Sequence, residues 1–317
     1  MSRLINPQDI PEHLWEPKSE TLYLPTPLIE QWISLLEANN LAGKALEIAP
    51  DSFVGGMSKE DTDNHFAWRF TGSCARTMLS FLDPKNDLRQ IADAYVRAFA
   101  GNKVFLVDLP CGAGAATASI LTTLANLREF NIIPRMPINI VIVGGEISEH
   151  ARNYTQAILK GLQDYLNHQA IWIDYQTIAW DVCDPMSNSS LVKKITLAGQ
   201  DCDTKLLILA NFSNFLEKAN KWAKAAPQFE EIFRHSRDQD SFAVWIEPSS
   251  KAVKNGFFSG LSQWFARLFR LNPRCDSDKT EDTYAESHAL TQHPLKRHRF
   301  RVNLVVRRFD FPNEMQP

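Results

Sequence analysis

The chain predicts an α/β fold with a largely parallel sheet, helices on both faces of that sheet, and an N-terminal helical cap. The first hundred residues show helical spacing of apolar positions. From residue 104 onward, short β-type apolar runs alternate with helical segments, which is typical of a parallel sheet. The last run, residues 299–309, alternates apolar and polar residues, as antiparallel edge strands do.

The N-terminal part, residues 1–99, is interpreted as an arm followed by the helical cap. Residues 1–27 contain five prolines and predict an extended arm lying on another part of the molecule. Apolar spacing predicts helices over residues 28–40, 61–82 and 87–99, with Asp83-Pro84 separating the last two.

The remainder, residues 100–312, is interpreted as one domain. Strands are predicted at residues 104–109, 138–143, 171–179, 205–210, 242–246 and 299–309. Helices are predicted at residues 115–130, 148–167, 216–226 and 259–271.

Composition excludes several classes of protein. With 317 residues, 44% of them hydrophobic, and a net charge of -3, the chain predicts a globular protein rather than a disordered one. No apolar run is long enough to span a membrane, and no apolar leader begins the chain, so a cytoplasmic protein is expected. The five cysteines form no C-x-x-C pair, and we predict neither a disulfide scaffold nor a metal site.

A glycine turn follows the first strand of the second part. The sequence runs from Asp108 through Gly112 and Gly114 directly into a predicted helix. Glycines let the backbone turn sharply and approach a ligand closely, and the start of a helix offers free N–H groups to an anion. In open α/β sheets this edge is where ligands bind.

Acidic residues also follow the next two strands. Glu146 ends the second strand, where a carboxylate can accept both hydroxyls of a ribose, and Asp181 follows the third. The alternative is that these acids cap the following helices. Three acids at one sheet edge favour a ligand site.

These motifs resemble, in the same order, those of the class I S-adenosylmethionine-dependent methyltransferases. The stretch DLPCGAG at 108–114 resembles the first motif, Glu146 the ribose-binding acid, and Asp181 with Val182 the adenine-binding pair. Pro110 departs from the family, which often has glycine there. The resemblance implies a seven-stranded Rossmann-like sheet with its last strand antiparallel, S-adenosylmethionine as cofactor, and transfer of its methyl group. The implied cofactor-binding residues are Arg76, Asp108, Pro110, Cys111, Gly112, Gly114, Glu146, Ile147, Asp181, Val182 and Asn211.

A dinucleotide-binding protein is the nearest alternative, because it also combines a glycine turn with an acid on the second strand. Its third glycine is missing here, where Thr117 stands. This favours the methyl donor over NAD.

Three residues are candidates for catalysis. Glu247 ends the fifth strand and is interpreted either as a general base or as a residue that holds a loop. Asn211 follows the fourth strand, as an acceptor-contacting or a turn residue. His65 lies in the cap as a possible base. Arg69 and Arg76 lie seven residues apart on one helix face, and one of them is a candidate to pair with the carboxylate of the cofactor. The alternative is a surface arginine, or one paired with Asp61 or Asp63.

The acceptor is expected to be a small molecule or a peptide. RNA or a protein is the alternative, because residues 293–308 carry six basic residues and no acidic one, whereas residues 1–64 carry eleven acidic and four basic residues. A second alternative is a non-catalytic domain that uses the fold to bind a protein partner.

Overall fold

The computed structural model describes residues 5–50, 56–218, 220–237, 241–249, 260, 261, 264, 283–296 and 298–311. The predicted helix at residues 259–271 therefore lies almost entirely outside the described residues.

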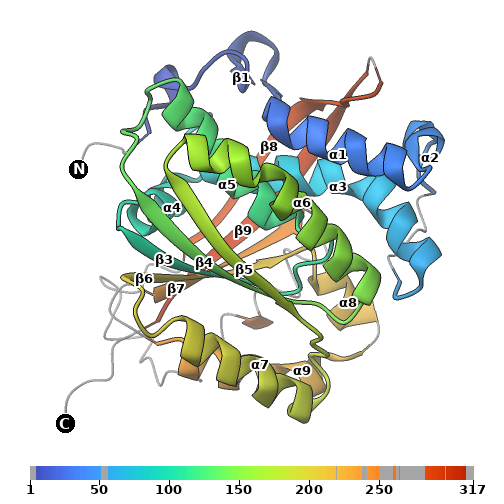
Figure 1. Cartoon of the computed structure of the whole chain (residues 1–317), viewed down its shortest axis with the longest axis vertical. Coiled ribbons are helices and arrows are strands. Elements are labelled where there is room, and N and C mark those ends of the chain that lie inside the picture. The colour runs from blue at the N-terminus through green and yellow to red at the C-terminus, as the bar shows by residue number, and fades with distance from the viewer. Residues whose placement is uncertain are drawn as a thin grey trace.

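One mixed sheet forms the centre of the structure (Figure 1), with its described strands in the order β1-β2-β8-β9-β7-β6-β3-β4-β5. The strands are β1 (Trp15–Glu16), β2 (Thr21–Leu22), β3 (Lys103–Asp108), β4 (Ile138–Gly145), β5 (Ile171–Ile178), β6 (Thr204–Ala210), β7 (Ser241–Pro248), β8 (Thr283–Gln292) and β9 (Arg299–Asp310). Strands β3 to β7 are parallel, and β9 runs antiparallel to both β7 and β8. The predicted antiparallel last strand is confirmed.

The predicted number of seven strands is wrong, because the described residues form a sheet of nine. The two additional strands, β1 and β2, come from the arm, and β2 pairs in parallel with β8 at the edge of the sheet. Pairing partners almost 270 positions apart in the chain give no local signal. Without β1 and β2, seven strands remain.

The helices that cover the sheet are α1 (Thr26–Ala38), α2 (Ala42–Leu46), α3 (Lys59–Leu82), α4 (Arg89–Ala98), α5 (Ala115–Glu129), α6 (Glu149–His168), α7 (Pro185–Ala198), α8 (Ser213–Lys218) and α9 (Trp222–His235). The predictions of α1 and of α3 to α6 are confirmed within about two residues. The helix predicted at 216–226 is wrong, because the chain turns at Asn220, whose φ is 49°, and α9 continues to residue 235.

Two apolar cores lie on opposite faces of the sheet. One joins α1, α3, α4, α5 and α6 to the sheet, and the other joins it to α7, α8 and α9 (Figure 1). The first core includes residues from Ile5 to Val306, so the N-terminal segments pack against the same sheet as the rest of the chain. Among the described helices, none is both long and apolar enough to cross a membrane.

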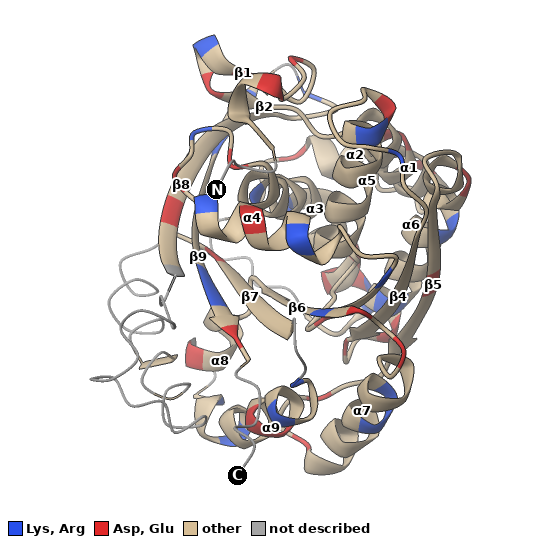
Figure 2. Cartoon of the chain, turned by 90° about the vertical axis from the view of Figure 1, so that its left-hand side faces the viewer, with Lys and Arg blue, Asp and Glu red and all other residues tan. Residues whose placement is uncertain are grey.

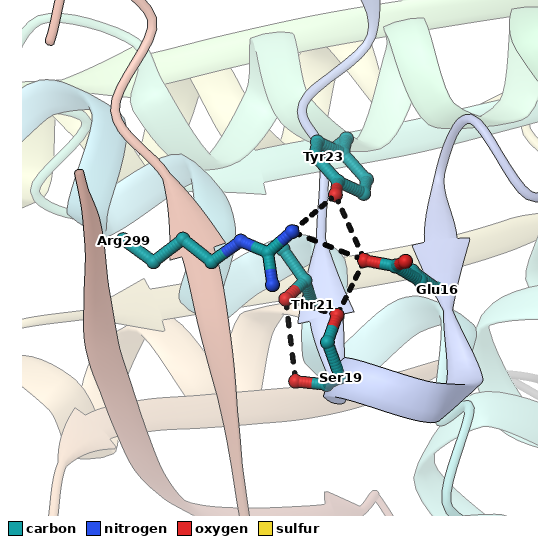
Figure 3. A network of polar contacts seen from close by, with 5 residues as sticks. All are labelled: Glu16, Ser19, Thr21, Tyr23 and Arg299. Carbon is teal, nitrogen blue, oxygen red and sulfur yellow. Dashed lines mark hydrogen bonds and ion pairs between the residues drawn. The ribbon is translucent and has the colours of Figure 1, made fainter. Parts of the chain in front are cut away.

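The predicted arm packs against the end of the β8–β9 hairpin. Glu16 accepts hydrogen bonds from Ser19 and from the Tyr23 hydroxyl (3.1 Å), and Arg299 of β9 lies 3.1 Å from the same carboxylate oxygen (Figure 3). Hydrogen bonds from Ser19 and Tyr23 and the charge of Arg299 lower the pKa of Glu16. A charged Glu16 therefore fastens the arm to the sheet.

Candidate functional site

The direction of winding reverses between β3 and β6. From β3 the chain adds β4 and β5 on one side, and then β6 and β7 on the other. Such a switch point opens a crevice outside the carboxyl ends of the strands, and ligands of open α/β sheets bind there. The predicted glycine turn follows β3 at this edge.

The glycine turn combines one packed and one open position. Gly114 has a φ of 80°, and a Cβ there would lie 3.1 Å from the Thr155 side chain. Gly112 has a φ of 52°, but a Cβ there would meet no atom of the described part of the chain within 4 Å. Thr155 of α6 fixes the turn by donating a hydrogen bond to the Gly112 carbonyl (2.8 Å). The backbone beside Gly112 is therefore held in place and has space for a ligand.

The two residues between Asp108 and the glycines are part of the same turn. The peptide bond from Leu109 to Pro110 is cis. Cys111 is buried, and its backbone N–H donates to the Gly145 carbonyl at the end of β4 (3.0 Å). Burial raises the pKa of the Cys111 thiol, so the neutral thiol fills space in the turn.

Asp108 lies beneath the turn and is 1% exposed. Its Oδ2 accepts a hydrogen bond from Thr117 (2.7 Å), and its Oδ1 has no partner among the described residues. Burial raises the pKa of Asp108 to about 7. A buried carboxyl oxygen without a partner leaves a hydrogen-bonding position open beneath the turn.

Glu146, at the end of β4, faces the turn. One carboxylate oxygen accepts the Gly112 N–H (3.2 Å), and the other accepts the Ser148 N–H (2.8 Å). A carboxylate has about four acceptor positions, so two remain for a ligand. Burial raises the pKa of Glu146. The neighbouring Ile147 is 42% exposed and offers an apolar surface beside it.

Asp181 and Val182 follow β5 at the same edge. The Asp181 carboxylate accepts the Cys183 N–H (2.8 Å). The Val182 side chain is buried in the core, so its backbone is the part that can face a ligand.

The alternative that the three acids cap helices does not hold. The N-cap residues of α5, α6 and α7 are Gly114, Ser148 and Asp184. None of the three strand-end acids is therefore needed to cap the helix that follows it.

Helix α3 crosses this edge of the sheet. Near its start, Thr62 lies 3.1 Å from the Ser148 hydroxyl, next to Glu146. Further along, the Cys74 carbonyl accepts a hydrogen bond from Ser119 of α5 (2.9 Å). Beyond that, the Arg76 guanidinium donates to Asn211 (3.0 Å). The helix thus extends from the end of β4 to the end of β6.

Arg76 and Asn211 fix each other at the end of β6. Asn211 has a φ of 58°, and its N–H donates to the Ile246 carbonyl of β7 (2.9 Å). Burial lowers the pKa of Arg76 to about 10, and the nearby charge of Glu247 opposes that shift. Arg76 therefore remains charged at neutral pH.

Glu247 is fully buried behind this pair. Its Oε1 accepts hydrogen bonds from the backbone N–H groups of Phe212 and Ser213 and from the Trp245 indole, each 2.8 Å long. Burial raises the pKa of Glu247. The carboxylate therefore holds the loop after β6, and the general-base role of Glu247 stays a prediction.

His65 lies on α3 near Arg69 and Arg76. Burial, together with the charges of these two arginines, lowers the pKa of His65 to about 4. The imidazole is therefore neutral at pH 7. Its predicted role as a base stays a prediction.

The sequence does not predict the roles of two residues of the site. Thr155 fixes Gly112, and Thr117 is the donor to Asp108. In the sequence, Thr117 stands out only because it occupies the position of a third glycine. Thr155 lies 43 positions from Gly112, so no local motif marks it.

No known family profile and no curated protein sequence matches the chain. Solved structures give distant likenesses. A Listeria monocytogenes protein assigned to the class I S-adenosylmethionine-dependent methyltransferases is 10% identical, with a TM-score of 0.37, and the match covers 91% of this chain and 70% of that one. A precorrin-6y C5,15-methyltransferase from Geobacter metallireducens is 6% identical, with a TM-score of 0.34 and coverage of 70% and 88%.

A third structure comes from work on the conversion of a disulfide bond into a thioacetal group during echinomycin biosynthesis. It is 16% identical, with a TM-score of 0.33 and coverage of 69% and 82%. TM-scores this low establish neither ancestry nor activity. The interpretation of the site therefore depends on the strand order and on the contacts at the sheet edge.

Proposed function

We propose that the chain is an S-adenosylmethionine-dependent methyltransferase whose acceptor is a small molecule or a peptide. The observation that carries this proposal is the pairing of Glu146 with the open glycine turn. The carboxylate lies 3.2 Å from the Gly112 nitrogen, and no atom of the described residues lies within 4 Å of the place that a Cβ at Gly112 would take.

The polar groups at the edge match the parts of the cofactor. Glu146 keeps two acceptor positions for ribose hydroxyls. The exposed Ile147 side chain and the Val182 backbone are suited to the flat adenine, and Asp181 to its amino group. Arg76 is suited to the carboxylate of the methionine part. Among the described residues its Nε donates to Asn211 and its Nη2 to Ser73, and a guanidinium has five N–H groups, so further donors remain for a ligand. The unpartnered Oδ1 of Asp108 supplies a further hydrogen-bonding position.

When bound, S-adenosylmethionine supplies an activated methyl group on a sulfonium. The protein's part is mainly alignment, because a displacement needs the acceptor, the methyl carbon and the sulfur in line. Asn211, fixed by Arg76 and by the Ile246 carbonyl, would orient the acceptor. Glu247 would contribute by holding the backbone after Asn211. Helix α3 would exclude water from the edge.

A titration calorimetry experiment tests the proposal. S-adenosylmethionine and NAD are titrated separately into the full chain, the Glu146→Gln variant and the Glu149→Gln variant. Glu149 is an exposed acid three residues away, at the start of α6, and is the matched control for loss of a negative charge. We expect the methyl donor alone to bind, with affinity about ten-fold or more weaker in Glu146→Gln and unchanged in Glu149→Gln.

Other results separate the alternatives. Binding of NAD alone would make this a dinucleotide-binding protein. If neither compound bound to the folded wild-type chain, the proposal would be wrong, and the fold would serve as a partner-binding domain.

A further inference from the structure

We infer that the acceptor carries an anionic group, which binds over Gly72 of α3 between Arg69 and Arg76. The inference rests on the proposed function and adds the chemical class of the acceptor.

Gly72 lies where glycine is costly, because glycine in the interior of a helix lowers stability relative to alanine. It lies at the middle of the 24-residue helix α3, and its φ is not in the left-handed region. An alanine would fit, since its Cβ would lie 3.6 Å from the Phe300 ring and 3.9 Å from the Arg76 guanidinium, which are ordinary contacts. Neither backbone nor packing therefore requires glycine. What glycine provides is space on a partly exposed helix face.

Positively charged side chains flank Gly72 on the same face of α3. At about 100° per residue, positions 65, 69, 72 and 76 lie within an arc of about 60° on one helix face. The two arginines share this face two helical turns apart, and the charge of Arg69 contributes to the lowered pKa of Arg76. Among the described residues, neither arginine lies within 4.0 Å of a carboxylate. Within the described ranges, Arg69 donates a hydrogen bond to the Pro50 carbonyl (3.2 Å).

The first residues of β9 lie opposite this face of α3. Leu304 of β9 pairs with Pro248, the last residue of β7, so the preceding residues of β9 extend beyond the carboxyl end of β7. Phe300 lies in this extension and faces Gly72. The space over Gly72 thus has positive charge along the helix and an aromatic ring beside it, which suits a flat molecule with a carboxylate.

The cofactor leaves one of the two arginines free. Arg69 and Arg76 are seven residues apart, so their backbones are roughly 10 Å apart along the helix. Arg76 contacts Asn211 at the strand edge and is the one suited to the cofactor. Arg69 then remains for a second anion.

Benzoate and its neutral counterpart benzamide are the probes. Each is titrated by calorimetry into the full chain saturated with S-adenosylhomocysteine, and into the variants Arg69→Gln and Gly72→Ala. Arg97→Gln, which changes an exposed arginine on α4, is the matched control. Affinity for S-adenosylhomocysteine is measured separately for each variant.

We expect benzoate to bind at least about ten-fold more tightly than benzamide. Arg69→Gln and Gly72→Ala should each weaken benzoate by about ten-fold or more, the first by removing charge and the second by filling the space. Arg97→Gln should change nothing. Affinity for S-adenosylhomocysteine should be the same in all four proteins, which also shows that the variants are folded.

Three results would overturn the inference. They are equal affinity for benzoate and benzamide, no binding of benzoate, or benzoate affinity unchanged in both α3 variants. Loss of S-adenosylhomocysteine binding in a folded Arg69→Gln would also do so, because Arg69 would then belong to the cofactor site. If wild type bound benzoate as expected but no S-adenosylhomocysteine, the anion site would stand and the proposed methyl transfer would fall.

Discussion

Gly72→Ala should make the protein more stable, although it blocks the proposed acceptor site. Replacing glycine by alanine in a helix interior stabilises a protein by about 1 kcal/mol. The new methyl group would lie 3.6 Å from Phe300 and 3.9 Å from Arg76, so no steric cost offsets that gain. In a chain of 317 residues, this should raise Tm by about 2 °C.

Equilibrium unfolding in urea measures this effect, with Gly161→Ala as the comparison. Gly161 also lies in a helix interior, but its Cβ would lie 2.2 Å from the Gln31 side chain and displace it from its hydrogen bond to the Ala157 carbonyl. We therefore expect a smaller gain there, or a loss. A folded Gly72→Ala that is less stable than wild type by about 1 kcal/mol would refute the reasoning, because Gly72 would then be needed for packing.

Three further predictions concern titrating groups. Burial raises the pKa of Asp108 from 3.8 to about 7, so between these pH values the folded state holds a proton that the unfolded state has lost. The free energy of unfolding of the wild type should therefore fall as pH rises from about 4 to 7, by up to about 4 kcal/mol. Asp108→Asn should remove most of that slope in urea unfolding at pH 5 and pH 8. Glu16→Gln should speed hydrogen exchange of the β2 amides at pH 7, and the difference should vanish as pH falls through the lowered pKa of Glu16. The imidazole of His65 should show no NMR inflection between pH 5 and 8, and Arg69→Gln should raise its pKa; an inflection near 6.5 in wild type would contradict the burial argument.

Sequence alone predicts the part of the fold that depends on local pattern. The parallel strands β3, β4, β6 and β7 are mostly apolar, and the alternation of β9 predicted its antiparallel direction. The order of strands and helices predicted that the glycine turn and Glu146 lie at one edge of the sheet. The structure brings them within hydrogen-bonding distance there. Carboxyl ends of neighbouring parallel strands must meet there.

Strand β8 shows where local pattern fails. Its sequence, TYAESHALTQ, contains alanine, serine, glutamate and glutamine, which have weak strand preference. The strand forms because it pairs along its whole length with β9 and lies beside β2. Partners distant in sequence therefore determine this strand.

The position of α3 could not be predicted for the same reason. Apolar spacing predicted the helix, but its contacts to Ser148 and Asn211 span 86 and 135 positions. These long-range contacts help to bring Gly72, Arg69 and Arg76 to the strand edge. The chemistry of the acceptor, which depends on this helix, is accordingly visible only in the fold.

The charge asymmetry of the chain is partly balanced within the molecule. Among the basic residues 293–308, Arg299 pairs with Glu16 of the arm, Arg308 pairs with Asp310, and Lys296 donates to the Glu47 carbonyl. Figure 2 shows basic segments on β9, and acidic segments on β8 and beside β1. Phosphate binding needs cations that are still free. The RNA alternative stays a prediction, and it depends most on Arg301, which is exposed and has no ion pair among the described residues.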